Sequence, residues 1–108
     1  MHYDLLIISK ENLKHPLLKE FAYSSLDPGH YLVNPYETDN HLSFDYLIFD
    51  DFNVVKNIDI MIDGGIIITN CYFQTNYEHL FALGKINGST LPLSEQLQRI
   101  LEFLLNPN

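Results

Sequence analysis

The sequence predicts an α/β fold: a small three-layer domain with a mostly parallel sheet, flanking helices and an added β-ribbon. Continuous apolar runs such as residues 3–9 are typical of strands buried on both faces, as in parallel sheets. The first run leads into a strand–helix–strand pattern, which is how a parallel unit begins. An amphipathic helix ends the chain. At 108 residues, we expect one domain that spans residues 1–108.

The first part of the chain predicts a strand, a helix and a second strand. Residues 3–9 form the expected first strand and residues 11–24 the expected helix. Pro16 suits the first turn of such a helix better than its interior, because proline lacks a backbone donor. Residues 27–29 (Asp-Pro-Gly) predict a turn, and residues 31–33 predict the second strand.

The middle of the chain predicts a loop, a strand and a hairpin. Residues 35–43 are polar and indicate a loop, and residues 44–52 predict a strand. Residues 58–62 and 66–69 are rich in isoleucine and flank Asp63-Gly64, which is a hairpin turn signal. A short apolar run then predicts one more buried strand at residues 80–83.

The C-terminal helix has clear start and stop signals. Ser89 or Thr90 can cap it, Pro92 fits its first turn, and Glu95 lies where the helix dipole favours an anion. Asn106-Pro107 ends it. Its apolar stripe, at helical spacing, consists of Leu93, Leu97, Ile100, Leu101 and Leu104.

Composition excludes several classes of function. The net charge of −8, with only 6 basic residues, argues against a nucleic-acid or anionic-membrane surface. No apolar run approaches the roughly 20 residues of a membrane span, and the start of the chain lacks a signal-peptide pattern. The single cysteine, Cys71, excludes an internal disulfide framework. We therefore expect a cytoplasmic protein.

The sequence predicts neither a catalytic residue nor a metal site. Asp45, Asp50 and Asp51 invite a metal or acid–base interpretation, but strand ends and surface loops explain them better. The five histidines lack close metal-ligand spacing. Cys71 has no neighbouring His or Lys to lower its pKa, so we expect a buried thiol and not a nucleophile.

One stretch resembles the C-terminal flavin-binding segment of thioredoxin-reductase-like flavoproteins, which reads roughly T-x-x-x-x-(I/L)-F-A-A-G-D. Lys85 stands where that family has Asp. Looser similarity extends to residues 2–8, 44–49 and 63–68, which resemble other strands of the family's flavin domain. The positions that match the segment are Thr75, Leu80, Phe81, Ala82 and Gly84.

The resemblance implies a shortened FAD/NAD(P)-binding-like domain, with some family features missing. The turn after the first strand should be Gly-x-Gly-x-x-Gly, so that backbone amides approach the pyrophosphate. Here Ser9, Lys10 and Glu11 occupy that path. The chain has no room for the NADPH domain or its Cys-x-x-Cys pair. Where a flavin is held, the resemblance implies contacts from Gly84, Lys85, Ser94, Glu95 and Gln96. Helix solvation and capping explain the last three better.

Two functions are therefore open. The favoured one is a non-catalytic binding or assembly module that has no cofactor and cannot bind a dinucleotide in the usual way. The alternative is a flavin-dependent oxidoreductase, or a subunit of one, that holds FAD or FMN at Gly84-Lys85 and the start of the C-terminal helix. A reduced scaffold rich in Tyr, Phe, Ile and Leu also leaves apolar surface uncovered, so we expect a homodimer, with another protein as a further possible partner.

Overall fold

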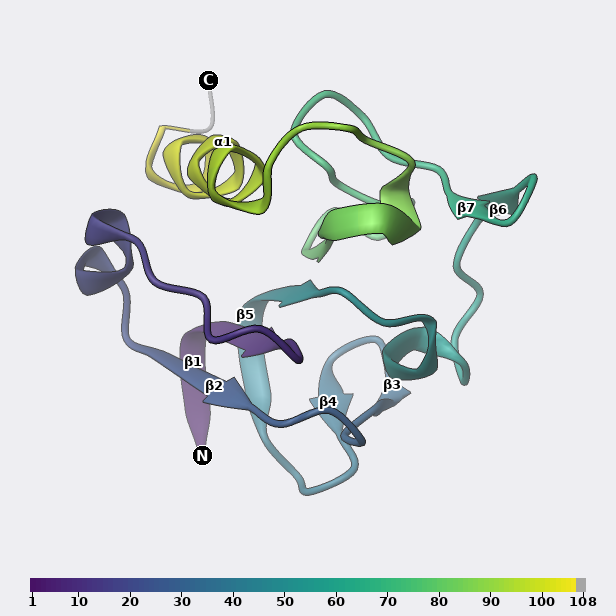
Figure 1. Ribbon diagram of the computed structural model, residues 1–108. Helices are drawn as coiled ribbons and strands as arrows, with labels where there is room; N and C mark the ends of the chain where they lie inside the picture. Colours follow the sequence, from purple (N-terminus) through teal and green to yellow (C-terminus); the bar gives the residue numbers. More distant parts are fainter. Residues whose placement is uncertain (107–108) are drawn as a thin grey trace.

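The computed structural model describes residues 1–106, and its central feature is a six-stranded mixed sheet (Figure 1). The strand order is β2-β1-β5-β4-β3, and β8 also pairs with β5. The pairs β1–β2, β1–β5 and β5–β8 are parallel, whereas β4 is antiparallel to both β3 and β5. These strands are β1 (His2–Ile8), β2 (Tyr23–Leu26), β3 (Leu32–Asn34), β4 (Glu37–Thr38), β5 (Ser43–Phe49) and β8 (Leu80–Ala82).

The remaining elements are short, apart from one helix. A separate two-stranded sheet consists of β6 (Ile62–Asp63) and β7 (Ile66–Ile67), joined at Gly64-Gly65. Within residues 1–106 the one α-helix is α1 (Leu93–Leu105), and no helix has the length and apolar character that a membrane span requires. Three 3-10 helices are η1 (Pro16–Glu20), η2 (Phe52–Val55) and η3 (Gly84–Asn87).

The sheet is buried on both faces because its central strands alternate between two cores. In β1, Leu6 and Ile8 join one core, whereas Leu5 and Ile7 join the other. The first core lies under η2, β3 and β7; the second lies under α1 and η1. Figure 1 shows this division: α1 and η1 lie on the left of the sheet, and η2 and the hairpin lie on the right.

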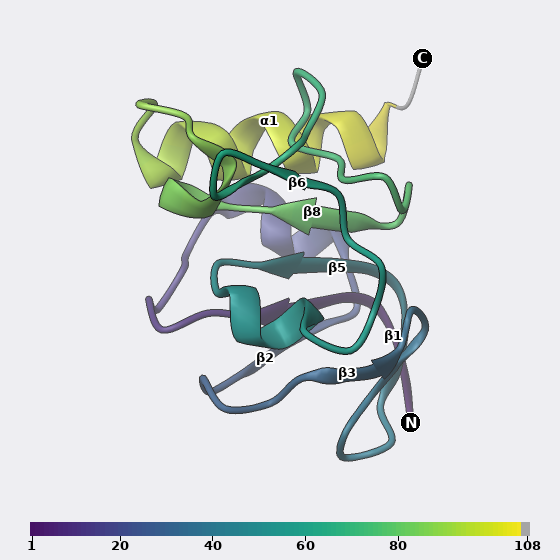
Figure 2. The same cartoon turned by 90° about the vertical axis from the view of Figure 1, so that its right-hand side faces the viewer.

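The predicted fold class is wrong. A three-layer α/β domain with a mostly parallel sheet and flanking helices requires helices on both faces, but α1 is the only α-helix in the described part of the chain. The face opposite α1 is covered by η2, by the hairpin and by loops (Figure 2). The sheet itself is mixed, because β3 and β4 fold back as an antiparallel extension. The apolar runs were correctly assigned to strands, but they do not say what covers each face.

The predicted helix over residues 11–24 is also wrong. Only the 3-10 helix η1 forms, and it starts at Pro16, with His15 Nδ1 accepting from the Leu17 amide. Residues 11–15 are irregular, and after η1 the chain turns to pair with β1. The Ala22 carbonyl accepts from Asp4 N, and the Asp4 carboxylate accepts from Ala22 N. The chain then continues as β2, parallel to β1. Residues 31–33, predicted as the parallel neighbour, contribute instead to the antiparallel β3.

The C-terminal helix was predicted at the correct place, and a hairpin does form near Gly64, but residues 58–61 are not part of it and Asp63 belongs to β6 and not to the turn. The hairpin turn lies at Gly64-Gly65, and each of its strands is two residues long. In α1 the predicted stripe faces the core, with Leu97, Ile100 and Leu101 buried. The predicted cap is wrong: Pro92 is the N-cap residue and makes no side-chain capping bond. Ser89 Oγ instead accepts from the Leu91 amide, within the loop before the helix.

Candidate functional site

One candidate site lies where three parallel strands end. Ile8, Phe49 and Ala82 are aligned at the carboxyl ends of β1, β5 and β8, which lie on the left in Figure 2. Beyond them is a pocket of about 700 Å³, at the position where open α/β sheets bind ligands. Its lining comes from the segments that follow β1, β5 and β8 and from the start of α1. The polar and charged lining residues are Lys10, Glu11, Asp50, Lys85, Ser89, Thr90 and Gln96.

A buried glutamine fastens α1 to the end of β8. Gln96 is 1% exposed, and its Oε1 accepts from Gly84 N and from Asn87 Nδ2, both at 2.9 Å. Its Nε2 donates to the Leu91 carbonyl at 2.8 Å. Gly84 has φ +84°, a left-handed conformation that favours glycine and that turns its amide toward Gln96. Gln96 therefore satisfies the backbone of this turn, and its polar atoms are used inside the protein.

The turn after β1 is closed on itself. Ser9 Oγ accepts from the Glu11 amide at 2.9 Å and donates to Asp50 Oδ2 at 2.7 Å. The amide of Glu11 is thus occupied by a side chain of its own turn. The next helix does not start until Pro16 and has only five residues, so it offers this pocket no helix N-terminus after β1.

The charges around the pocket offset one another. The lining has two lysines, Lys10 and Lys85, and two acidic residues, Glu11 and Asp50, so it has no excess of positive charge. A diphosphate needs several converging amides or an excess of cations, and two carboxylates oppose it here. The residues of this site do not fit the diphosphate of FAD.

The structure brings together three of the five residues implied as flavin contacts. Gly84, Lys85 and Gln96 line the pocket at the carboxyl edge. Ser94 and Glu95 are exposed and lie outside its lining. The polar atoms of Gln96 are already bonded inside the protein. Of the implied flavin contacts that line the pocket, Lys85 is therefore the one with a side chain left to bind a ligand.

The other sequence candidates are scattered. Asp45 pairs with His2, Asp50 accepts from Ser9, and Asp51 caps η2 by accepting from Asn53 N. The three carboxylates therefore act separately; Asp50 and Asp51 follow the end of β5 as predicted, whereas Asp45 lies within that strand. The prediction of a buried thiol is wrong, since Cys71 is exposed in a turn after the hairpin.

An aromatic site at the opposite edge was missed by the sequence reasoning. A pocket of about 660 Å³ lies at the amino ends of β5 and β8. His79 stacks on Tyr36, with ring centroids 4.8 Å apart and planes within 7°. Its Nε2 contacts the Pro35 carbonyl, which holds the ring in place. Tyr36 and His79 are 43 positions apart in the chain (79 − 36), so no local spacing pattern could have joined them.

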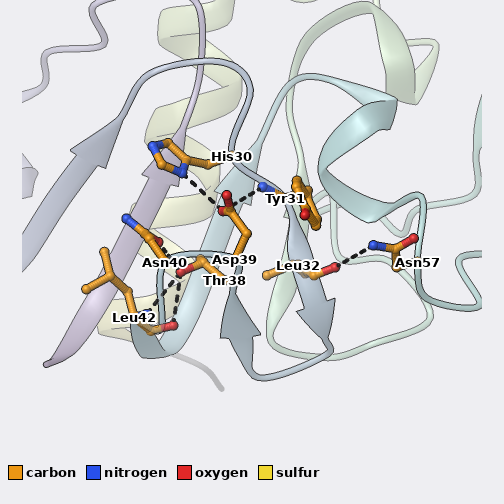
Figure 3. Close-up of polar contacts among 8 residues, drawn as sticks. All are labelled: His30, Tyr31, Leu32, Thr38, Asp39, Asn40, Leu42 and Asn57. Atoms are coloured by element: carbon orange, nitrogen blue, oxygen red, sulfur yellow. Dashed lines mark hydrogen bonds and ion pairs between the residues drawn. The ribbon is translucent and has the colours of Figure 1, made fainter.

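A second polar cluster joins the loop between β4 and β5, which leads into the amino end of β5, to the segment just before β3 (Figure 3). Asp39 accepts from His30 Nδ1 at 3.0 Å and from Tyr31 N at 3.2 Å. Burial acts to raise the pKa of Asp39, but the hydrogen bonds from His30 and Tyr31, with the charge of His30, together hold that pKa below its ordinary value of 3.8. The buried Thr38 completes the loop, since its Oγ1 accepts from Leu42 N at 3.0 Å.

No family model, curated protein or solved structure matches this chain. The resemblance to the flavin-binding segment of thioredoxin-reductase-like proteins therefore stays a prediction. Functional inference for this protein rests on its own geometry.

Proposed function

We propose that this chain is a non-catalytic binding and assembly module, and that it assembles through the β6–β7 hairpin. The exposure of that hairpin carries the proposal. Met61, Ile62 and Ile68 expose 54%, 49% and 45% of their surface, although all three are apolar. Within residues 1–106, β6 and β7 pair only with each other. An exposed apolar strand pair with no further strand beside it is a typical surface for association.

The occupant that we propose is a second copy of this chain. An apolar hairpin can pack on its own two-fold image, which makes a closed dimer. Burying each of these side chains contributes about 1 kcal/mol or more. The net charge of −8 on each copy opposes that contact. Salt screens this repulsion, so a homodimer should strengthen as salt rises, whereas a basic partner on the same surface would bind more weakly.

The closed turn after β1 supports the non-catalytic part of the proposal. Ser9 occupies the amide of Glu11, and Glu11 and Asp50 contribute negative charge to the pocket beyond β1. A cytoplasmic location is part of the same proposal. Cys71 is a free and exposed thiol, which suits a reducing compartment.

Light scattering on a sizing column tests the assembly, over roughly 1–500 µM protein, a range that covers micromolar affinities. We expect a dimer for the natural chain, a monomer for Ile62→Lys, and a dimer for Val33→Lys. Val33 is the matched control because it is 45% exposed on β3, away from the hairpin. A natural chain that is monomeric throughout, or a dimer that Val33→Lys disrupts and Ile62→Lys does not, overturns the proposal.

A further inference from the structure

The pocket at the amino edge combines flat aromatic walls with negative charge. Its aromatic lining includes Tyr36, Phe44, Tyr46 and His79. Phe44 and Tyr36 both stack on His79, at centroid distances of 6.1 and 4.8 Å. Tyr36 remains 64% exposed, so one face of this ring stack is open to a ligand.

Two carboxylates lie beside the rings. Asp45 and Glu78 both line the pocket, and within residues 1–106 no Lys or Arg does. Asp45 already contacts His2 Nε2 through Oδ1 at 2.8 Å. The Glu78 carboxylate makes no hydrogen bond or ion pair with the described residues, although the Glu78 carbonyl accepts from Gln74 Nε2. Glu78 is therefore the free charge of the site.

Aromatic faces and a carboxylate together select a planar cation. A guanidinium group stacks on aromatic rings and donates two parallel hydrogen bonds to one carboxylate, whereas an ammonium is a compact, strongly hydrated charge. The chain as a whole has 14 acidic and 6 basic residues, so its field attracts basic partners.

We propose that the pocket formed by Tyr36, Phe44, His79 and Glu78 binds an arginine side chain of a basic partner protein. The guanidinium stacks on the exposed Tyr36 ring and donates to Glu78. That a natural partner exists rests on the proposed binding function, whereas the arginine site itself does not. The pocket is distinct from the hairpin, so the two can be tested separately.

The test titrates a blocked peptide, Ac-Gly-Arg-Arg-Gly-NH2, into the ¹⁵N-labelled chain and follows amide shifts by NMR. We expect the largest shifts at Tyr36, Glu78 and His79. We also expect the matched Lys-Lys peptide to bind at least about 3-fold more weakly, because lysine makes poorer stacking and single-point contacts.

Four variants localise the site. Tyr36→Ala and Glu78→Gln should each lower the affinity for the Arg-Arg peptide by about 3-fold or more, since each removes one contact with the guanidinium. Tyr23→Ala and Glu20→Gln are the controls, being exposed residues of the same types outside the pocket lining. An unchanged melting temperature shows that Tyr36→Ala and Glu78→Gln are folded. If Tyr36→Ala melts at a lower temperature, the loss of peptide affinity in Glu78→Gln decides the test by itself.

Two results overturn the inference: shifts spread evenly over the acidic surface, or equal binding by the pocket variants and their controls. The Ile62→Lys variant separates this inference from the assembly proposal. A variant that is monomeric but binds the peptide supports both. If the natural chain is a dimer but does not bind the Arg-Arg peptide, the arginine site is rejected and the assembly proposal stands.

Discussion

The two edges of the parallel strands are stabilised by different chemistry. At the carboxyl edge, the amide side chain of Gln96 and the hydroxyl of Ser9 satisfy the turns, and within residues 1–106 no imidazole lines the pocket. At the amino edge, His2 pairs with Asp45 and His30 pairs with Asp39. The turns of the carboxyl edge are thus held by amide and hydroxyl groups, and those of the amino edge by imidazole–carboxylate pairs.

The two edges also differ in how many polar groups are free to contact a ligand. The carboxyl edge, where ligands usually bind in such sheets, is fastened by internal hydrogen bonds around Gln96. The amino edge instead displays the Tyr36–His79 stack and the free carboxylate of Glu78. If the arginine site proposed above is correct, this protein binds at the edge opposite to the one that such sheets usually use.

The largest expected effect is on stability at the carboxyl edge. Gln96→Ala should reduce the free energy of unfolding by about 2–4 kcal/mol, because it leaves the Gly84 amide and the Asn87 side chain without their acceptor in a buried site. Urea unfolding measures it. Gln98→Ala, an exposed position on the same helix, is the control and should change stability by less than about 0.5 kcal/mol. Equal effects of both variants would show that this edge is not held by Gln96.

A smaller effect is expected at the amino edge, and it should depend on pH. The pKa of Asp39 is lower in the folded chain than its ordinary value of 3.8, so folding favours the carboxylate. The resulting stability is fully present above the unfolded pKa and is lost as pH falls through the folded pKa. Asp39→Asn should therefore cost about 0.5–1 kcal/mol at neutral pH and less below about pH 3.

Urea unfolding of Asp39→Asn and the natural chain at several pH values measures this prediction. Asp27→Asn is the control because Asp27 is exposed. A cost for Asp39→Asn that stays constant down to pH 2 would contradict the assignment, since a lost ionic contact must vanish once the carboxyl is protonated.

The smallest expected effect concerns flavin. Added FAD or FMN at about 1 mM should shift the thermal midpoint by less than about 1 °C, because the carboxyl-edge pocket has two carboxylates for its two lysines. A ligand with a Kd near 10 µM would shift it by several degrees or more. A shift of that size, abolished by Lys85→Ala and retained in Lys14→Ala, would restore the alternative of a flavin-binding protein.

Local patterns in the sequence were enough to predict the elements that bury apolar side chains. The apolar runs of β1 and β5 and the stripe of α1 were all found, because buried positions are apolar and recur at a spacing that the sequence shows. The polar strand β2 shows no such pattern: its Ser24 and Ser25 pair with β1 although their side chains resemble those of a loop. The covering of the second face could not be predicted, because it depends on 3-10 turns and loops without periodicity.

The candidate site was predicted in part for the same reason. Gly84 and Lys85 follow a recognisable strand, so their position in the turn could be read locally. The contact between Ser9 and Asp50 joins residues 41 positions apart and depends on β1 lying beside β5. Contacts of that kind require the strand order, which the sequence did not reveal.

The central position of β1 has a consequence for synthesis on the ribosome. β1 is made before both of its partners, and β5 starts 41 residues after the start of β1. Before β5 is made, β2 is the one strand of the sheet that can pair with the Leu-Leu-Ile-Ile segment of β1, so one edge of that segment stays open to intermolecular strand pairing. The open edge of β1 should therefore promote association between chains until β5 has paired with it.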